Sequence, residues 1–299
     1  MEKSSYCWVS GSRGFVGSAF AAELLRRKLP STFITNTEPS DGLAHVKFGC
    51  SSIVEKSLEK YGVPDIYFHI GWGNVYQPDS ETHLGDNLEQ TARLFETLYK
   101  NGVGKIISLG SSSEYGELEG ELSEWQQPIG RLTKYAQAKI ESSKLGFSLA
   151  KTYNSNFIHV RLFHVLGISS RSNSLINQLY RAYKQSTVLK LTNCDQYRDY
   201  IWIEDVVEAL LRLTSVEHSG IINLGSGRSR QLRDFIELFW SKLAAGDNLL
   251  QFGALGRPED EPAQPRCSAS LEKLREWLRW VPPTLLDDAL SKMVADLKR

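Results

Sequence analysis

Residues 11–17 read Gly-Ser-Arg-Gly-Phe-Val-Gly, and this stretch decides the fold. It follows the apolar run Tyr6–Ser10 and opens the amphipathic segment Ser18–Lys28, which predicts a turn between a strand and a helix. The first glycine permits a tight turn, the second lets a pyrophosphate approach the backbone, and the third lets helix and strand pack closely. The spacing therefore predicts a dinucleotide-binding loop at a helix N-terminus. Its candidate contacts are Gly11, Arg13, Gly14, Phe15, Val16 and Gly17.

The end of the second predicted strand, Thr32–Asn36, indicates which dinucleotide binds. An acidic residue at this place would hold the ribose 2′-hydroxyl of NAD. Here no acid occurs before Glu38, and the neutral end at Asn36 tolerates a 2′-phosphate. Arg13 is placed to pair with that phosphate in a bidentate manner. We therefore expect NADP(H) as the preferred cofactor, with Asn36 in the cofactor site and NAD(H) still possible.

Strand-like and helix-like segments alternate through the first half of the chain. Such alternation predicts an α/β fold, a Rossmann-type doubly wound parallel sheet with a smaller, mixed C-terminal substrate-binding lobe. We expect a dinucleotide-binding domain at 1–168, to which 196–228 return, and a substrate lobe at 169–299. After the loop, the predicted elements are strands at 65–71, 105–110, 157–163, 200–203 and 221–224 and helices at 51–61, 87–101, 135–151, 175–183, 206–213, 231–243, 271–280 and 285–298.

Composition limits the classes of function. The 299 residues carry 35 Lys and Arg against 35 Asp and Glu, so a generally basic nucleic-acid binder is excluded. No apolar run approaches the roughly 18 residues that a membrane span needs. The four cysteines have no spacing typical of a disulfide framework or a zinc site. We therefore expect a cytoplasmic protein with no metal, no nucleic-acid partner and no membrane partner.

Two polar groups in the middle of the chain are candidates for chemistry. Tyr135 and Lys139 form a YxxxK pair at the start of a predicted helix, where the i, i+4 spacing places both on one face. An ammonium next to a tyrosine hydroxyl favours the phenolate, so the pair can exchange a proton with a substrate. Upstream, the strand 105–110 leads into a serine cluster at its carboxyl end, the edge at which open α/β sheets place their sites.

The order of glycine loop, serine cluster and YxxxK resembles the extended short-chain dehydrogenase/reductases of the NAD-dependent epimerase/dehydratase type, which act on nucleotide sugars. Five further blocks match that family in the same order along nearly the whole chain. They lie at 65–69, 161–167, 196–206, 222–227 and 256–258, and Asn87 matches a helix asparagine of the family. The short CDP-abequose and CDP-paratose synthase-like 4-ketoreductases are the most similar members.

The resemblance assigns roles to individual residues. It implies that Ser111 and Tyr135 are catalytic, that Lys139 assists Tyr135 and holds the nicotinamide ribose, and that Asn87 contacts the cofactor. It also implies a homodimer formed through the helices 87–101 and 135–151. The substrate contacts that it implies are Ser112, Ser113, His164, Ser174, Arg198 and Arg257.

Departures from the family narrow the reaction. Sugar-nucleotide dehydratases carry an acid/base pair after the catalytic hydroxyl, whereas this chain has Ser112 and Ser113, which disfavours dehydration. Glu114 is expected to point elsewhere along an extended segment. His164 stands where the family usually has asparagine, and could contact the diphosphate or the sugar, or be structural. Trp72 replaces a small residue and either covers the nicotinamide or simply packs.

The expected reaction is an NADPH-dependent reduction of a nucleotide-linked 4-keto-6-deoxyhexose at C4, in deoxysugar or polysaccharide biosynthesis. One alternative is an NAD-dependent C4 epimerase of a UDP-sugar, which would use the same residues in both directions and consume no NADPH. A non-catalytic NAD(P)-binding regulator is a further alternative, but such a protein has no need of the Ser–Tyr–Lys set. The sequence leaves the nucleotide base and the sugar open.

Overall fold

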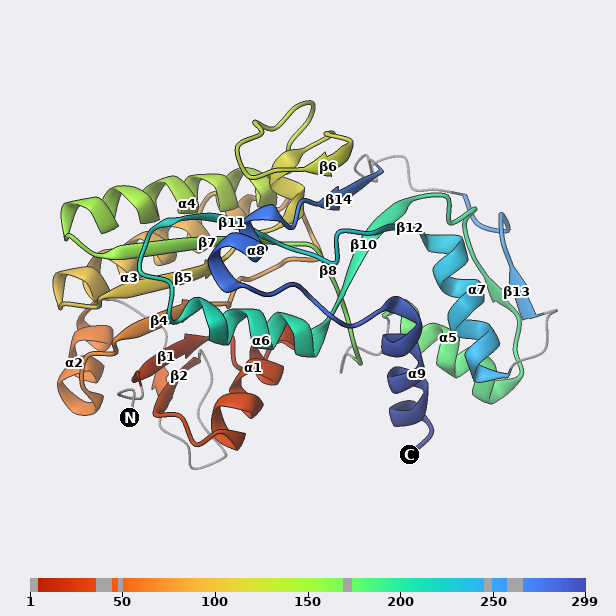
Figure 1. The fold of residues 1–299 in the computed structure, drawn as a ribbon, viewed down its shortest axis with the longest axis horizontal. Coiled ribbons are helices and arrows are strands. Elements are labelled where there is room, and N and C mark those ends of the chain that lie inside the picture. The colour runs from red at the N-terminus through yellow and green to blue at the C-terminus, as the bar shows by residue number, and fades with distance from the viewer. Residues whose placement is uncertain (1–4, 36–44, 48–50, 169–173, 245–248, 257–265) are drawn as a thin grey trace.

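A parallel sheet with helices on both faces forms the larger part of the molecule (Figure 1). The computed structural model of the chain describes residues 5–35, 45–47, 51–168, 174–244, 249–256 and 266–299. Two predicted site residues, Asn36 and Arg257, therefore lie outside the described residues, as do Glu38 and Cys50.

The sheet has seven strands in the order β11-β7-β5-β4-β1-β2-β3, and all neighbours are parallel. Its strands are β1 (Cys7–Ser10), β2 (Ser31–Thr35), β3 (His45–Lys47), β4 (Ile66–His69), β5 (Lys105–Leu109), β7 (Asn156–Leu162) and β11 (Gly220–Leu224). The order reverses between β1 and β4, and open α/β sheets bind their ligands in the crevice at such a switch point. This architecture confirms the predicted doubly wound fold.

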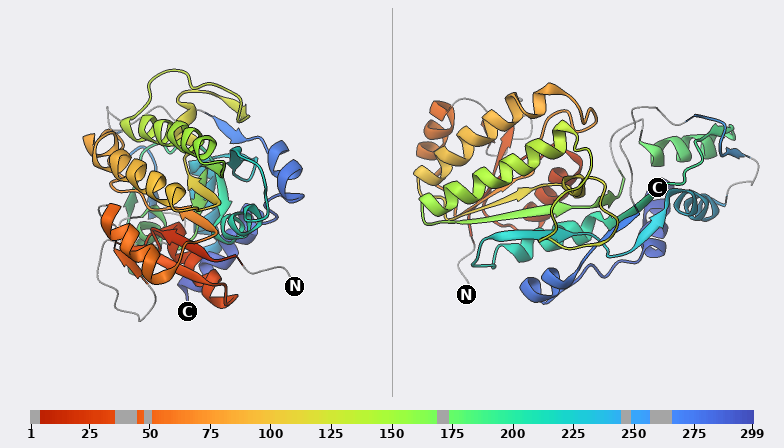
Figure 2. Two further views of the ribbon diagram at one scale, coloured as in Figure 1. Left: turned by 90° about the vertical axis from the view of Figure 1, so that its left-hand side faces the viewer. Right: turned by 90° about the horizontal axis from the view of Figure 1, so that it is seen from above.

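Helices cover both faces of the sheet, as the views in Figures 1 and 2 show. One face carries α2 (Ser51–Tyr61), α3 (Asp86–Lys100) and α4 (Lys134–Thr152), and the other carries α1 (Phe15–Arg26), α6 (Ile203–Leu213) and α8 (Glu272–Leu278). Successive residues of each strand point to opposite faces of the sheet and so pack into the two helix layers in turn. Thus Trp8 and Tyr67 join the cluster under α3 and α4, whereas Val9 and Phe68 join the cluster under α1 and α6. Both layers are fully buried, which is why these strands lack any polar alternation.

The second lobe is smaller and mixed, as expected. It contains the three-stranded sheet β8 (His164–Leu166), β10 (Tyr197–Trp202) and β12 (Ser229–Gln231), the helices α5 (Leu175–Gln185), α7 (Leu232–Leu243) and α9 (Leu286–Leu297), and the pair β9 (Leu189–Lys190) and β13 (Leu250–Gln251). Its core is rich in aromatic residues, among them Trp202, Phe235 and Phe239. Two strands, β6 (Gly120–Leu122) and β14 (Cys267–Ala269), pair outside both larger sheets, and two 3₁₀ turns are η1 (Glu81–His83) and η2 (Ser112–Tyr115).

Buried aspartates of the 196–206 block join distant segments. Asp199 accepts hydrogen bonds from the amides of Ser226, Gly227 and Ala269, at 2.7, 3.0 and 2.9 Å. Asp205 accepts from the amide and the hydroxyl of Thr284. These bonds attach β10 to the chain after β11 and to β14, and α6 to the chain after α8, so this block has a structural role in the fold. The domain boundaries given above stay a prediction.

Among the described residues, no helix combines the length and the apolarity that crossing a bilayer requires.

Candidate active site

The glycine loop lies where the chain segments after β1 and β4 touch. Gly11 has a φ of +75°, and a Cβ on it would lie 2.6 Å from the Cα of Gly71. A Cβ on Gly17 would lie 2.0 Å from the carbonyl oxygen of Gly11. The amide of Gly14 donates to that same carbonyl at 2.8 Å. Both Gly11 and Gly17 are thus required by close backbone contacts, as the spacing predicts.

The N-terminus of α1 is open to an anion. Gly14 is the N-cap, no side chain caps the helix, and its first turn contains no acidic residue. The first amides of a helix have no partner within the helix and carry partial positive charge. Beside them lies a cavity of about 340 Å³ whose walls include Gly11, Arg13, Gly14, Thr35, Trp72 and Asn87. The residues present therefore fit the pyrophosphate and ribose of a dinucleotide.

The remaining loop residues lie at the start of α1, which begins at Phe15 rather than at Ser18. The ring of Phe15 packs toward Gly167 at the end of β8, whereas Val16 and Gly17 continue the first turn. Asn87 lies in the first turn of α3 and donates from Nδ2 to the carbonyl oxygen of Gly73 at 3.0 Å. This bond holds the segment after β4 against α3 at the wall of the cavity.

Ser111 is held in a tight turn at the carboxyl end of β5. It is the N-cap of η2, and its Oγ accepts from the amide and the hydroxyl of Ser113 at 3.2 and 2.9 Å. Glu114 completes a capping box, because its Oε1 accepts from the Ser111 amide at 2.7 Å. The expectation that Glu114 lies on an extended segment is wrong. Residues 112–115 form a 3₁₀ turn, which directs the Glu114 side chain inward instead.

Tyr135 and Lys139 lie one helical turn apart at the start of α4. Thr133 caps this helix through its hydroxyl, which accepts from the Ala136 amide at 3.2 Å. Lys139 is only 2% exposed, and its Nζ donates to the carbonyl oxygen of Leu109 at 2.7 Å. Since Leu109 is the last residue of β5, this bond joins α4 to the strand that carries Ser111. The turn and the helix thus bring the three predicted catalytic residues together.

Two aromatic side chains border this pair, Trp72, which departs from the family pattern, and His83, which no motif marks. The Lys139 Nζ lies 3.9 Å from the centre of the Trp72 ring, a cation–π contact. The indole N–H of Trp72 donates to Nδ1 of the buried His83 at 3.0 Å, and the His83 ring lies 5.3 Å from that of Tyr135. Trp72 therefore packs on Lys139 while also lining the cavity. No spacing in the sequence marks His83, which lies in the 3₁₀ turn η1 before α3.

Burial shifts the pKa of each of the two titratable groups. It raises the pKa of the Tyr135 hydroxyl to about 12, with a further increase from the Glu114 carboxylate and a decrease from a hydrogen bond with Ser111. Burial also lowers the pKa of Lys139 to about 7, and Glu114 opposes this shift. At neutral pH the tyrosine is protonated, which is the state that a general acid needs.

Three of the predicted substrate residues, His164, Ser174 and Arg198, belong to elements of the second lobe. His164 begins β8 and Arg198 lies in β10, in a parallel pairing whose register sets Tyr200 opposite His164. Solvent reaches the imidazole of His164. The pKa of His164 is nevertheless lowered, first by desolvation within the surrounding protein and then by the positive charge of Arg198. This side chain is therefore neutral at pH 7. Ser174 is the N-cap of α5, and its hydroxyl accepts from the Asn177 amide at 3.3 Å. Their substrate contacts stay predictions.

No cluster of three or more His, Cys, Asp or Glu side chains in the described part of the chain is arranged to hold a metal ion.

Comparison with known proteins agrees with this geometry. A family model described as "NAD dependent epimerase/dehydratase family" matches residues 7–225. An uncharacterized UDP-glucose epimerase, YtcB, from Bacillus subtilis (strain 168) is 24% identical, over 97% of this chain and 96% of its own length. A dTDP-4-dehydro-6-deoxyglucose reductase from Escherichia coli is 22% identical, over 97% of this chain and 96% of its own.

Among solved structures, MoeE5 in complex with UDP-glucuronic acid and NAD has a similar fold. Its TM-score is 0.82 at 22% sequence identity, and the match covers 98% of this chain and 99% of that one. The likeness extends over both lobes, whereas the family model reaches from β1 to the end of β11. Because that model spans well over half of the sequence, the chain belongs to the NAD-dependent epimerase/dehydratase family, the extended short-chain dehydrogenase/reductases that are NAD(P)-dependent enzymes of nucleotide sugars.

Proposed function

We propose that the protein reduces a nucleotide-linked 4-keto-6-deoxyhexose at C4 with NADPH. The observation that carries the proposal is the set Ser111, Tyr135 and Lys139 at the end of β5 and the start of α4, next to the dinucleotide cavity and with Tyr135 protonated. The two positions after Ser111 hold hydroxyls where a dehydratase needs an acid and a base. A reductase of a dTDP-linked 4-dehydro-6-deoxysugar is among the relatives that match the whole chain.

In this reaction the side chains of the protein donate the proton to the C4 oxygen and stabilise the negative charge that develops. When bound, NADPH supplies the hydride that the carbonyl carbon of the sugar receives. Tyr135 donates its hydroxyl proton to the C4 oxygen, and the Ser111 hydroxyl donates a hydrogen bond to the same oxygen. Lys139 then stabilises the tyrosinate by its positive charge. Trp72 covers the ammonium and keeps bulk water from this end of the pair.

Arg13 is proposed to select NADPH. It lines the same cavity as Thr35, at the end of β2, where the adenosine ribose of a dinucleotide is expected. A guanidinium can donate two hydrogen bonds to a 2′-phosphate, and the neutral strand end does not repel it. Asn36, which follows this strand end, is proposed as a further contact.

Arg13→Ala should raise the KM for NADPH about 10- to 100-fold, since a charge-assisted bidentate contact contributes about 1.5–3 kcal/mol. The KM for NADH should change less than about threefold, because NADH lacks the phosphate. Initial rates with each cofactor measure the two effects. Arg26→Ala, at the other end of α1, is the matched control and should change neither. An equal loss with both cofactors would mean that Arg13 does not contact the phosphate.

The substrate is proposed to lie between the two lobes, with its diphosphate near Arg198 and Arg257. His164, Ser112, Ser113 and Ser174 are the further proposed contacts. Two like copies are proposed to associate through α3 and α4, which lie side by side on one face of the sheet (Figure 1). A cytoplasmic location completes the proposal, in keeping with a cysteine spacing that is not typical of a disulfide framework.

An NAD-dependent C4 epimerase of a UDP-sugar is the second candidate. Two findings support it: YtcB bears the name of a UDP-glucose epimerase, and MoeE5 was solved with a UDP-sugar and NAD. Tyr135, aided by Ser111 and Lys139, would then take the proton of the C4 hydroxyl and return it, while the hydride would pass from C4 to NAD⁺ and back to the same carbon. Such an enzyme shows no net consumption of NADPH.

The proposal is tested with a panel of CDP-, dTDP-, GDP- and UDP-linked 4-keto-6-deoxysugars. Each sugar nucleotide is mixed with an equimolar amount of NADPH, and oxidation of the NADPH is measured by its absorbance at 340 nm. We expect stoichiometric oxidation of NADPH with at least one of the four, which also identifies the base. Interconversion of UDP-glucose and UDP-galactose without cofactor consumption would favour the epimerase instead.

A further inference from the structure

The geometry points to Glu114 as a positioning residue of the active site: its buried carboxylate fixes the turn that presents Ser111 and places a negative charge within the protein on the side of the Tyr135–Lys139 pair. This inference rests on the proposed function, because it concerns how the same three residues are held ready. It adds a group that touches neither substrate nor cofactor.

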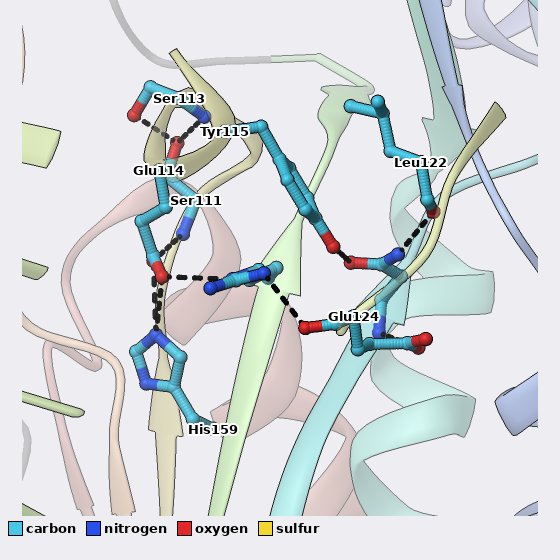
Figure 3. A network of polar contacts seen from close by, with 9 residues as sticks. Ser111, Ser113, Glu114, Tyr115, Leu122, Glu124 and His159 are labelled. Atoms are coloured by element: carbon cyan, nitrogen blue, oxygen red, sulfur yellow. Dashed lines mark hydrogen bonds and ion pairs between the residues drawn. The ribbon is translucent and has the colours of Figure 1, made fainter. Parts of the chain in front are cut away.

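The carboxylate of Glu114 is buried and contacts the Ser111 backbone and the His159 ring (Figure 3). Oε1 accepts from the Ser111 amide at 2.7 Å, and both oxygens lie 3.0 Å from Nε2 of His159. Oε2 also accepts from Nε of Arg161 at 3.1 Å. The side chains of Glu114 and His159 are 1% and 0% exposed. A buried carboxylate with this many donors stays ionised, and its pKa is held below the usual value by His159 and Arg161 despite burial.

These partners arise from different parts of the chain. His159 and Arg161 are two residues apart on β7, so both point to the same face of the sheet. Arg161 is fixed further by its contact with the Tyr115 ring, 4.4 Å from the ring centre, and by the bond from its Nη1 to the Glu124 carbonyl oxygen at 3.3 Å. Strand β7 therefore acts as a rigid support that fixes the carboxylate, and the carboxylate in turn fixes Ser111.

The space around Glu114 is matched to its side chain. A Cβ on Gly110, just before Ser111, would lie 2.2 Å from Oε1 of Glu114 and 2.3 Å from Nε2 of His159. The backbone at Gly110 thus passes directly over the pair. Any displacement of the carboxylate would be transmitted to Ser111 through the 2.7 Å bond from its amide.

The charge of Glu114 acts on the catalytic pair as well. It raises the pKa of both Tyr135 and Lys139, that is, it favours the protonated form of each. The other titratable groups that face the pair are His69 on β4, whose pKa the Lys139 charge helps to lower, and His83 on η1. Both of those are imidazoles, so Glu114 is the source of negative charge among these neighbours. Without it, both pKa values must fall, because a nearby anion stabilises an ammonium and destabilises a tyrosinate.

Glu114→Gln is the variant that tests this inference, since glutamine keeps the shape and an acceptor oxygen but removes the charge. We expect the kcat to fall about tenfold with little change in KM, and the alkaline limb of the pH profile to move down by about one unit. A purely structural role would lower activity at all pH values without moving the limb. Glu119→Gln, an exposed position five residues along, is the matched control and should leave both unchanged.

The charge effect is also measured without any substrate. NMR titration of protein labelled with ¹³C at lysine Cε should show Lys139 titrating near pH 7, assigned through its absence in Lys139→Arg, and about one unit lower in Glu114→Gln. If Glu114→Gln does not fold because Arg161 is left unpaired, the double variant Glu114→Gln/Arg161→Met removes both charges and takes its place. An unmoved Lys139 resonance and an unmoved alkaline limb would overturn the inference. A shifted resonance in a protein that reduces no sugar of the panel would leave the inference standing and contradict the proposed function.

Discussion

Tyr135→Phe is expected to reduce kcat about a thousandfold, within the range of about 10²–10⁴ that general acid catalysis contributes. The variant loses only the hydroxyl that donates a proton to the substrate oxygen. The aromatic ring, which packs edge-on against Trp72 and His83, is retained. NADPH affinity should therefore change little, and the protein should unfold at nearly the wild-type temperature.

Steady-state rates and cofactor titration by protein fluorescence measure these two properties separately. Tyr153→Phe, at the far end of α4, is the matched control, since its ring is partly buried against Tyr99 and lies remote from the site. It should keep full activity. Undiminished turnover in Tyr135→Phe would remove Tyr135 from the mechanism.

Gly17→Ala is expected to abolish NADPH binding, with at least a hundredfold loss of affinity. The new Cβ would lie 2.0 Å from the carbonyl oxygen of Gly11, which is backbone and cannot move aside without distorting the loop. Helix α1 would be pushed away from β1, and its N-terminal N–H groups would no longer point toward the pyrophosphate. We also expect a loss of stability of about 4 kcal/mol, at the upper end for single substitutions.

Isothermal titration with NADPH and urea unfolding measure the two effects. Gly104→Ala is the control, because a Cβ there would meet the Asp65 carbonyl oxygen at an ordinary 3.5 Å. That variant should bind and unfold like the wild type. Normal NADPH affinity in Gly17→Ala would show that the dinucleotide does not use this loop.

The parts of the site that the sequence predicts are those set by local geometry. Gly11 and Gly17 are required by a turn that seven consecutive residues form, and Tyr135 and Lys139 share a helix face through their spacing alone. The strand that ends at Leu109 indicates the serine cluster behind it, and the resemblance to the family selects Ser111 within that cluster. Each of these patterns is contained within one strand–turn or one helix, so the sequence specifies it directly.

The parts that escaped prediction depend on partners far apart in the chain. Glu114 meets His159 across 45 residues, and nothing near Glu114 in the sequence marks β7 as its neighbour. The 3₁₀ turn at 112–115, which overturned the expected extended segment, is stabilised by that same buried carboxylate. Trp72 was recognised as a departure, but its contact with Lys139 and His83 appears only once β4, η1 and α4 are packed together.

Hydride transfer to C4 is the central claim, and isotope tracing tests it most directly. The protein is incubated with NADPH carrying deuterium at C4 of the nicotinamide and with the 4-keto-6-deoxysugar nucleotide that the panel identifies. We predict one deuterium at C4 of the product sugar, seen by mass spectrometry and by loss of the H4 proton signal, with one NADP⁺ formed per sugar. A product without deuterium, or a UDP-sugar epimerised at C4 while NADPH stays unconsumed, would contradict the account.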